Sequence, residues 1–260
     1  MNTEEDKKRL PKVKFKTVSL KIELNLLYDF LFDNQWGWEK YIFKKHPKLK
    51  KVYEFKLKKE RKRFVLNYIK AYNFRHRKLI PKNKSKMEER WKIIEKKYFF
   101  ILAAIMNTNW PKNKKVITAM LSINPICPRF LKDWSFFINY QYKIKDVMEV
   151  MMHETCHFLY FKKWHELFPA IRLEKYESPF IEWHLSELLA PIILNDNRVQ
   201  KYLKQKAVFY EEHQKIKMNG VSAPVYFSRL YAKWLKSGEA FDYFLKDAYK
   251  VIKKHEKKFK

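Results

Sequence analysis

Five consecutive residues carry the clearest chemical signal in the sequence. They are His153, Glu154, Thr155, Cys156 and His157, an H-E-x-x-H pattern inside a stretch with the apolar spacing of a helix. Residues four apart lie about 40° apart around a helix axis, so both imidazoles can reach one metal ion. The carboxylate of Glu154 lies beside them, where it can accept a proton from water. Two histidines and one further protein ligand leave a fourth position open, which predicts a catalytic zinc centre.

The same residues have an ordinary alternative, in which both histidines are core side chains and Glu154 is solvated. The residues flanking the pattern are apolar on nearly every side, which predicts a buried helix. Two imidazoles and a carboxylate in that setting need partners, and one metal ion provides a partner for all of them. The burial therefore favours the metal site.

A second apolar helix, predicted over 179–195, supplies a candidate third ligand. Ser178 is expected as its N-cap, with Pro179 at the first helical position. Glu187 lies in its middle among leucines and isoleucines, which puts an acid in a buried setting. Pro191 removes the amide that would bond the Glu187 carbonyl, and we expect it to bend the helix there.

Two histidines are alternatives to Glu187 as the third metal ligand. In another role, either would contact the substrate or one of the metal ligands. His184 precedes Glu187 by three residues and shares roughly its face of the helix. His165 follows His157 by eight residues, beyond the point where two lysines indicate that the first helix reaches solvent. The pattern alone does not separate these candidates, but the proline favours Glu187 as the third ligand.

With these residues the chain resembles the zincin metallopeptidases, over about residues 115–195. The metzincin extension needs a glycine and a histidine where Tyr160 and Lys163 stand, so that subgroup does not fit. Glu187-Leu188-Leu189-Ala190 resembles the E-x-x-A signature of several gluzincin families. The resemblance implies zinc bound by His153, His157 and Glu187, and Glu154 as the general base. It also implies a sheet before the active-site helix, with an edge strand that pairs with an extended peptide substrate.

Two further features follow from resemblances to particular zincin groups. The SprT-like proteases often carry a cysteine inside the motif, as at Cys156, and take a third histidine downstream, which here is His165 or His184. Some gluzincins place a residue that polarises the substrate carbonyl in a later region. The candidates there, which the sequence does not separate, are His213, Tyr210, Tyr226 and Tyr231.

The order of predicted elements indicates an α+β fold that is mostly helical, with a small sheet containing antiparallel strands packed on the active-site helix. Strands are expected over 116–123 and 133–142, and a loop over 75–85. An acidic pair, Asp146 and Glu149, suggests a capping box at the start of the active-site helix. We expect a helical N-terminal region over 1–110 and a zincin-like domain over 111–260. The other predicted helices cover 19–34, 87–106, 223–236 and 239 to the basic tail.

Composition excludes some classes of function and leaves others open. Only 3 glycines are present, too few for a Rossmann or P-loop nucleotide site. The 2 cysteines favour a reducing compartment over a disulfide framework. The net charge of +29 favours polyanions such as nucleic acid, but an A/T-rich genome would also enrich lysine. The first ten residues lack the apolar core of a signal peptide, and the longest apolar run is about half a bilayer span, so we expect a cytoplasmic protein without a membrane span.

The sequence therefore predicts a zinc-dependent metallopeptidase acting on peptides or proteins, with possible weak nucleic-acid binding through its basic surface. Three alternatives stay open. The chain could be a SprT-like protease of nucleic-acid-bound proteins, a basic nucleic-acid-binding protein with a non-catalytic metal helix, or a regulator that cuts one dedicated partner protein.

Overall fold

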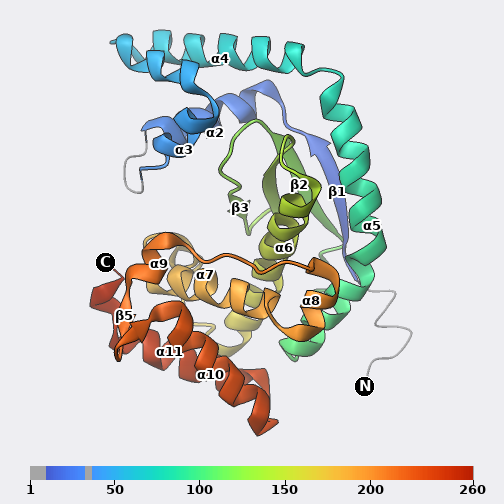
Figure 1. The fold of residues 1–260 in the computed structure, drawn as a ribbon, viewed down its shortest axis with the longest axis vertical. Coiled ribbons are helices and arrows are strands. Elements are labelled where there is room, and N and C mark those ends of the chain that lie inside the picture. The colour runs from blue at the N-terminus through green and yellow to red at the C-terminus, as the bar shows by residue number, and fades with distance from the viewer. Residues whose placement is uncertain (1–9, 33–36, 260) are drawn as a thin grey trace. The chain divides into compact units, whose positions relative to one another are not determined.

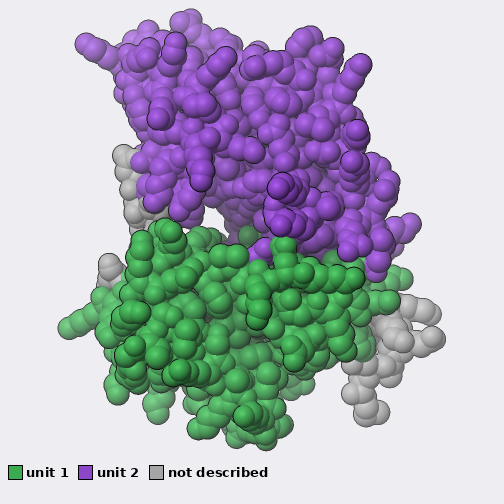
Figure 2. All heavy atoms as spheres, in the orientation of Figure 1, with its two compact units in different colours: residues 1–11, 94–115, 152–260 green, residues 12–93, 116–151 purple. Residues whose placement is uncertain are grey.

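The computed structural model describes residues 10–32 and 37–259. These residues form an α+β fold in which helices predominate and the sheets are small, which confirms the predicted fold class (Figure 1). The chain divides into two compact units, coloured separately in Figure 2. Unit 1 comprises residues 1–11, 94–115 and 152–260, and unit 2 comprises residues 12–93 and 116–151. The domain boundary near residue 110 stays a prediction.

Unit 2 is built on a mixed sheet with the strand order β1-β2-β4-β3. The central strand β2 pairs in parallel with β1 and β4, and β3 pairs antiparallel with β4. All five residues of β4 are buried, as expected for a parallel strand covered on both faces. The two predicted strands are confirmed as β2 and β4, whereas β1 and β3 were not predicted. The strands are β1 (Lys12–Thr17), β2 (Val116–Ser122), β3 (Arg129–Phe130) and β4 (Ser135–Asn139).

The helices of unit 2 correct one prediction. The stretch 75–85, expected as a loop, contains the start of α5 at Leu79. Pro81 lies in the first turn of this helix, where a backbone N–H has no helical acceptor, so the proline costs no hydrogen bond. The helix predicted over 19–34 is confirmed as α2, with residues 33 and 34 outside the described part. These helices are α2 (Leu20–Phe32), α3 (Glu39–Lys45), the 3-10 helix η1 (Pro47–Glu54), α4 (Lys58–Arg75) and α5 (Leu79–Ile105).

Unit 1 is almost entirely helical and contains the residues of the predicted metal site. Two expected helix starts are wrong. The helix α6 begins at Ile144, so Asp146 already lies in its first turn and forms no capping box, and α7 begins at Ile181 with Phe180, not Ser178, as its N-cap. The remaining predicted helices are confirmed. The helix α6 (Ile144–Leu167), like α5, contributes residues to both units. The other elements are η2 (Leu173–Tyr176), α7 (Ile181–Leu194), α8 (Asn197–Leu203), α9 (Glu211–Lys215), the hairpin β5 (Lys217–Met218) and β6 (Val221–Ser222), α10 (Ala223–Ser237), α11 (Phe241–Lys254) and η3 (Glu256–Lys258).

Among the described residues, no helix combines the length and the apolar composition that crossing a bilayer requires. The longest helix, α5, has 27 residues, but lysines and glutamates occur along much of it.

A buried polar network joins the helices of unit 2 to the carboxyl ends of its parallel strands. Glu23 of α2 is 1% exposed, and one of its carboxylate oxygens accepts a hydrogen bond of 2.5 Å from the Ser122 hydroxyl at the end of β2. The backbone carbonyl of Ile123 accepts hydrogen bonds from the His46 ring at 2.8 Å and from the Asn139 side chain at 2.7 Å. Because His46 Nε2 donates to this carbonyl, its Nδ1 accepts the hydroxyl of Tyr68 at 2.9 Å.

Burial raises the pKa of Glu23 from 4.5 to about 7, although hydrogen bonds from Ser122 and the backbone partly oppose this shift. An acid with a raised pKa in the folded state favours folding while it is protonated. This contribution is complete below the unfolded pKa of 4.5 and is lost as the pH rises through about 7.

We expect the Glu23→Gln variant to be more stable than the wild type at pH 8 and to lose less stability between pH 5 and pH 8. One pKa unit corresponds to about 1.4 kcal/mol, so the difference should reach a few kcal/mol. Chemical unfolding at the two pH values measures it. The matched control is Glu54→Gln, an exposed glutamate of η1, which should follow the wild type. Parallel pH profiles for the wild type and Glu23→Gln would show that this carboxyl does not titrate in the window.

Candidate metal centre

The helix α6, labelled in Figure 1, contains both histidines of the H-E-x-x-H pattern. Their spacing of four residues puts them one turn apart on the same face. Their ring centroids lie 4.6 Å apart, and the two Nε2 atoms are separated by 2.9 Å. His157 is 1% exposed, whereas the side chain of His153 keeps 18% of its surface exposed. The helix thus brings two ring nitrogens to one point, one from the interior and one from the surface side.

The helix α7 brings the carboxylate of Glu187 to the same point. One carboxylate oxygen lies 3.1 Å from His153 Nε2, and the other lies 3.3 Å from His157 Nε2. One possible ligand atom from each of these three residues lies within 4.8 Å of the others. The structure therefore places together the three residues that the sequence predicts as metal ligands.

These distances are compatible with a metal-binding site. Ligands at about 2.0–2.1 Å from a tetrahedral zinc ion lie about 3.3 Å from one another. The separations of 2.9 to 3.3 Å between the ring nitrogens and carboxylate oxygens of this cluster are close to that value. Two imidazole nitrogens with one carboxylate suit zinc and its neighbours, whereas magnesium and calcium prefer oxygen ligands throughout.

Burial explains why these polar groups must have partners. Every residue of α7 is buried, including four polar ones. Glu182 accepts a hydrogen bond from the Tyr249 hydroxyl at 2.8 Å, and Ser186 donates to the Trp183 carbonyl at 2.8 Å. An unpaired carboxylate in such a helix would cost several kcal/mol, and the partners of Glu187 are the two histidines of α6.

Packing holds His157 in position. Its ring stacks on Phe161 one turn later, with centroids 6.1 Å apart, and Phe161 stacks on Tyr176 at 4.6 Å. The hydroxyl of Tyr98, which belongs to α5, donates to the carbonyl of Met152 at 2.5 Å, directly before His153. Fixed side chains around a ligand set are what a metal site requires.

The predicted base, Glu154, is 8% exposed and lies between the two histidines along α6. It is three residues from His157, so the two side chains lie on neighbouring parts of the helix surface. Cys156 is fully buried, and its burial, together with the nearby charges of Glu187 and Glu154, raises the pKa of its thiol far above the usual range. Cys156 does not belong to the described group of candidate metal ligands, which comprises His153, His157 and Glu187.

The two rival histidines lie elsewhere. His165 is exposed in the last turn of α6. His184 is buried, and its Nδ1 lies 2.9 Å from Nε2 of His213 in α9. Neither residue belongs to the described group of candidate metal ligands.

The His184–His213 pair is a buried feature that the sequence did not predict as a pair. Burial lowers the pKa of both rings to about 4, so both are neutral at pH 7. His184 Nδ1 and His213 Nε2 share one hydrogen bond, in which one ring donates and the other accepts. The 29 residues between the two histidines leave no local spacing signal for this pair.

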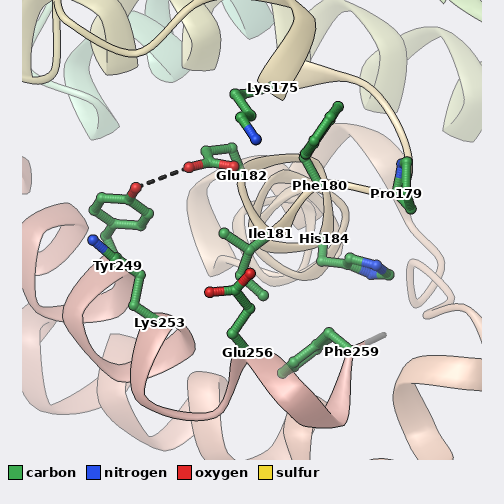
Figure 3. Close-up of a pocket in the computed structure, with 10 residues that line it drawn as sticks. All are labelled: Lys175, Pro179, Phe180, Ile181, Glu182, His184, Tyr249, Lys253, Glu256 and Phe259. Carbon is green, nitrogen blue, oxygen red and sulfur yellow. Dashed lines mark hydrogen bonds between the residues drawn. The ribbon is translucent and has the colours of Figure 1, made fainter.

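His184 also lines a pocket of about 570 Å³ at the start of α7 (Figure 3). The hydrogen-bonded pair Tyr249 and Glu182 lies on one side of the view, with His184 and Phe259 on the other. The ammonium of Lys175 lies 3.8 Å from the centre of the Phe180 ring. The pocket therefore combines aromatic walls with charged groups of both signs. Its other lining residues are Pro179, Ile181, Lys253 and Glu256.

The tyrosines considered as carbonyl-polarising residues lie in different settings. The hydroxyl of Tyr231 donates to the Asp196 carboxylate at 2.8 Å, and Arg198 donates to the same carboxylate. Tyr210 is 37% exposed and contacts the ring of His213. Tyr226 is half-buried in α10.

Comparison with known protein families, curated proteins and solved structures yields no match for this chain. The conclusion about function therefore depends on the donor set and its geometry. At that level the structure contains a possible metal-binding cluster of two histidines and one glutamate.

We expect zinc to raise the thermal unfolding temperature of the protein, because an ion that binds the folded state alone stabilises it. The gain is about 2.7 kcal/mol at a free zinc concentration one hundred times the Kd. His157→Ala should abolish the zinc-dependent shift, whereas His165→Ala, on the same helix but exposed, should retain it. Because an alanine at the buried position lowers stability by itself, the comparison uses the shift on adding zinc. Equal shifts in all three proteins would contradict a metal site at this cluster.

Proposed function

We propose that this protein is a zinc-dependent metallopeptidase of the gluzincin type. The observation that carries the proposal is the convergence of His153, His157 and the buried Glu187 carboxylate at one point, with Glu154 on the same helix as the histidines. In this proposal the three converging residues hold the zinc ion, and Glu154 is the general base. A bound zinc ion supplies Lewis-acid chemistry, which polarises water and the scissile carbonyl.

The proton transfers belong to Glu154. Hydrolysis joins the oxygen of water to the carbonyl carbon and breaks the bond from that carbon to the amide nitrogen. The Glu154 carboxylate accepts the proton that water loses and donates it to the departing nitrogen. Burial of this carboxylate supports the role, because packing around a buried side chain holds it in a defined orientation.

We extend the proposal to His184 as a substrate contact. It lines the pocket at the start of α7 and precedes Glu187 by one helical turn. A pocket of about 570 Å³ with aromatic walls is large enough for a substrate side chain. The exposed position of His165 gives it no comparable support.

In this proposal the catalytic domain comprises residues 111–260, and residues 1–110 are an N-terminal region that also contributes β1 to the sheet and Tyr98 to the backbone before His153. The SprT-like alternative needs a third imidazole at the cluster. In the structure the third group there is the carboxylate of Glu187, while His184 pairs with His213, which favours the gluzincin assignment.

We expect Glu154→Gln to lower peptide hydrolysis by about a hundredfold or more, because an amide keeps the shape of the side chain but cannot accept the proton. Zinc content, measured by elemental analysis, should stay at the wild-type level. The measurement is cleavage of an unstructured protein such as denatured casein and of a fluorogenic peptide mixture.

The matched control is Glu166→Gln, an exposed glutamate on the same helix that pairs with Lys162. It should retain wild-type turnover. If Glu154→Gln and Glu166→Gln hydrolyse at the same rate, Glu154 is not the base. If zinc binds but no peptide is cleaved by the wild type, the site is a metal site without the proposed activity.

A further inference from the structure

The positive charge of the chain is concentrated in one part of unit 2. From Lys40 to Lys92 the sequence contains 21 lysines and arginines and 4 acidic residues, a net charge of +17 out of the total of +29. An even distribution of the 57 basic residues along the 260 positions would put about 12 in this segment. A codon bias acts on the whole gene alike, so it does not account for this local excess.

The helix α4 arranges part of this charge along one face. Lys59, Arg63, Lys70 and Phe74 are all exposed and lie within a sector of about 60° around the helix axis. Val65 and Ile69, on another side of the helix, are fully buried. We call Lys59, Arg63, Lys70 and Phe74 the α4 basic face.

Neighbouring elements of the same unit add exposed lysines and few free carboxylates. Lys44, Lys45, Lys48, Lys50 and Lys51 of α3 and η1 are all exposed. Three of the four acids in the segment have local partners, whereas the fourth, Glu54 of η1, is exposed. Glu60 accepts the backbone N–H of Leu57, Glu88 pairs with Lys84 at 3.6 Å, and Glu89 accepts the Ser85 hydroxyl at 3.0 Å.

An exposed aromatic ring lies at the end of the α4 basic face. Phe74 is 67% exposed, and the guanidinium of Arg77 lies 4.3 Å from the centre of its ring. A ring and a guanidinium at the end of a row of cations form a surface on which a base can stack while the cations contact phosphates.

We propose that the α4 basic face binds nucleic acid through its phosphates, with Phe74 as a stacking contact for an unpaired base. A membrane surface is the other common anionic partner of a basic helix. A helix that inserts into a membrane exposes an apolar stripe, whereas Val65 and Ile69 of α4 point into the protein. This proposal does not depend on the metallopeptidase activity, because it uses none of the residues of the metal centre.

The experiment measures binding of fluorescent 20-nucleotide DNA, single-stranded and duplex, by anisotropy at several salt concentrations. The test variant is Lys59→Gln/Arg63→Gln/Lys70→Gln. The control, Arg229→Gln/Lys233→Gln/Lys236→Gln, removes one arginine and two lysines from the exposed side of α10. Glutamine keeps a high helix propensity, so both triple variants should fold.

The wild type should bind with an affinity that falls steeply with salt. The α4 variant should bind at least tenfold more weakly near 0.1 M salt, and its salt slope should be lower by about 2 to 3, because each lost phosphate contact removes about 0.9. The α10 variant should stay within about threefold of the wild type. Phe74→Ala should weaken single-strand binding about tenfold and leave duplex binding unchanged.

Three results would overturn the proposal. One is equal loss of affinity in the α4 and α10 variants, which would indicate diffuse attraction by total charge. Another is the absence of saturable DNA binding by the wild type at 50 mM salt. The third is binding to phosphatidylserine vesicles that depends on Lys59, Arg63 and Lys70 without any binding to DNA.

Discussion

The helix α7 is buried on every side but carries two glutamates and a histidine. These polar side chains need hydrogen-bonding or ionic partners, and in unit 1 the helices packed around α7 supply them. Glu182 accepts a hydrogen bond from a tyrosine hydroxyl of α11, and His184 shares a hydrogen bond with a histidine ring of α9. The carboxylate of Glu187 contacts the two imidazoles of α6. Each contact joins α7 to a different helix. The candidate metal centre is therefore one of three polar junctions that α7 makes with its neighbours, and the one whose donor atoms suit a metal ion.

The parts of the fold that the sequence predicts best are those with strong local periodicity. The helices α6, α10 and α11 follow from apolar spacing alone, and the strands β2 and β4 follow from β-branched and aromatic runs. The strand β1 alternates perfectly in its sequence, KVKFKT, but lysines occupy half of it and its partner β2 begins about a hundred residues later. A short strand of this kind becomes recognisable only with its partner beside it, because pairing across such a separation has no local signature.

At the candidate metal centre, the H-E-x-x-H spacing alone identifies the two histidines, whereas it leaves more than one candidate for the third metal ligand. Spacing cannot separate Glu187 from His184, because residues three apart on a helix share nearly the same face. The difference lies in the partner of His184, which is His213 on a short helix that the sequence did not predict. The wrong starts of α5, α6 and α7 have a similar cause. The residues Pro81, Asp146 and Ser178 fit more than one position around a helix end, and contacts with the rest of the protein select among them.

Unit 1 takes its residues from stretches that are not adjacent in the chain, and this has a consequence for how such a protein can change through evolution. Residues 94–105 of α5 belong to the same compact unit as the candidate metal ligands, and the Tyr98 hydroxyl among them donates to the Met152 carbonyl, directly before His153. A fragment that begins after α5 would lack this contact. No single continuous segment of the gene therefore encodes unit 1 alone. A duplication or fusion that transfers unit 1 would also transfer the segments of unit 2 that lie between its parts.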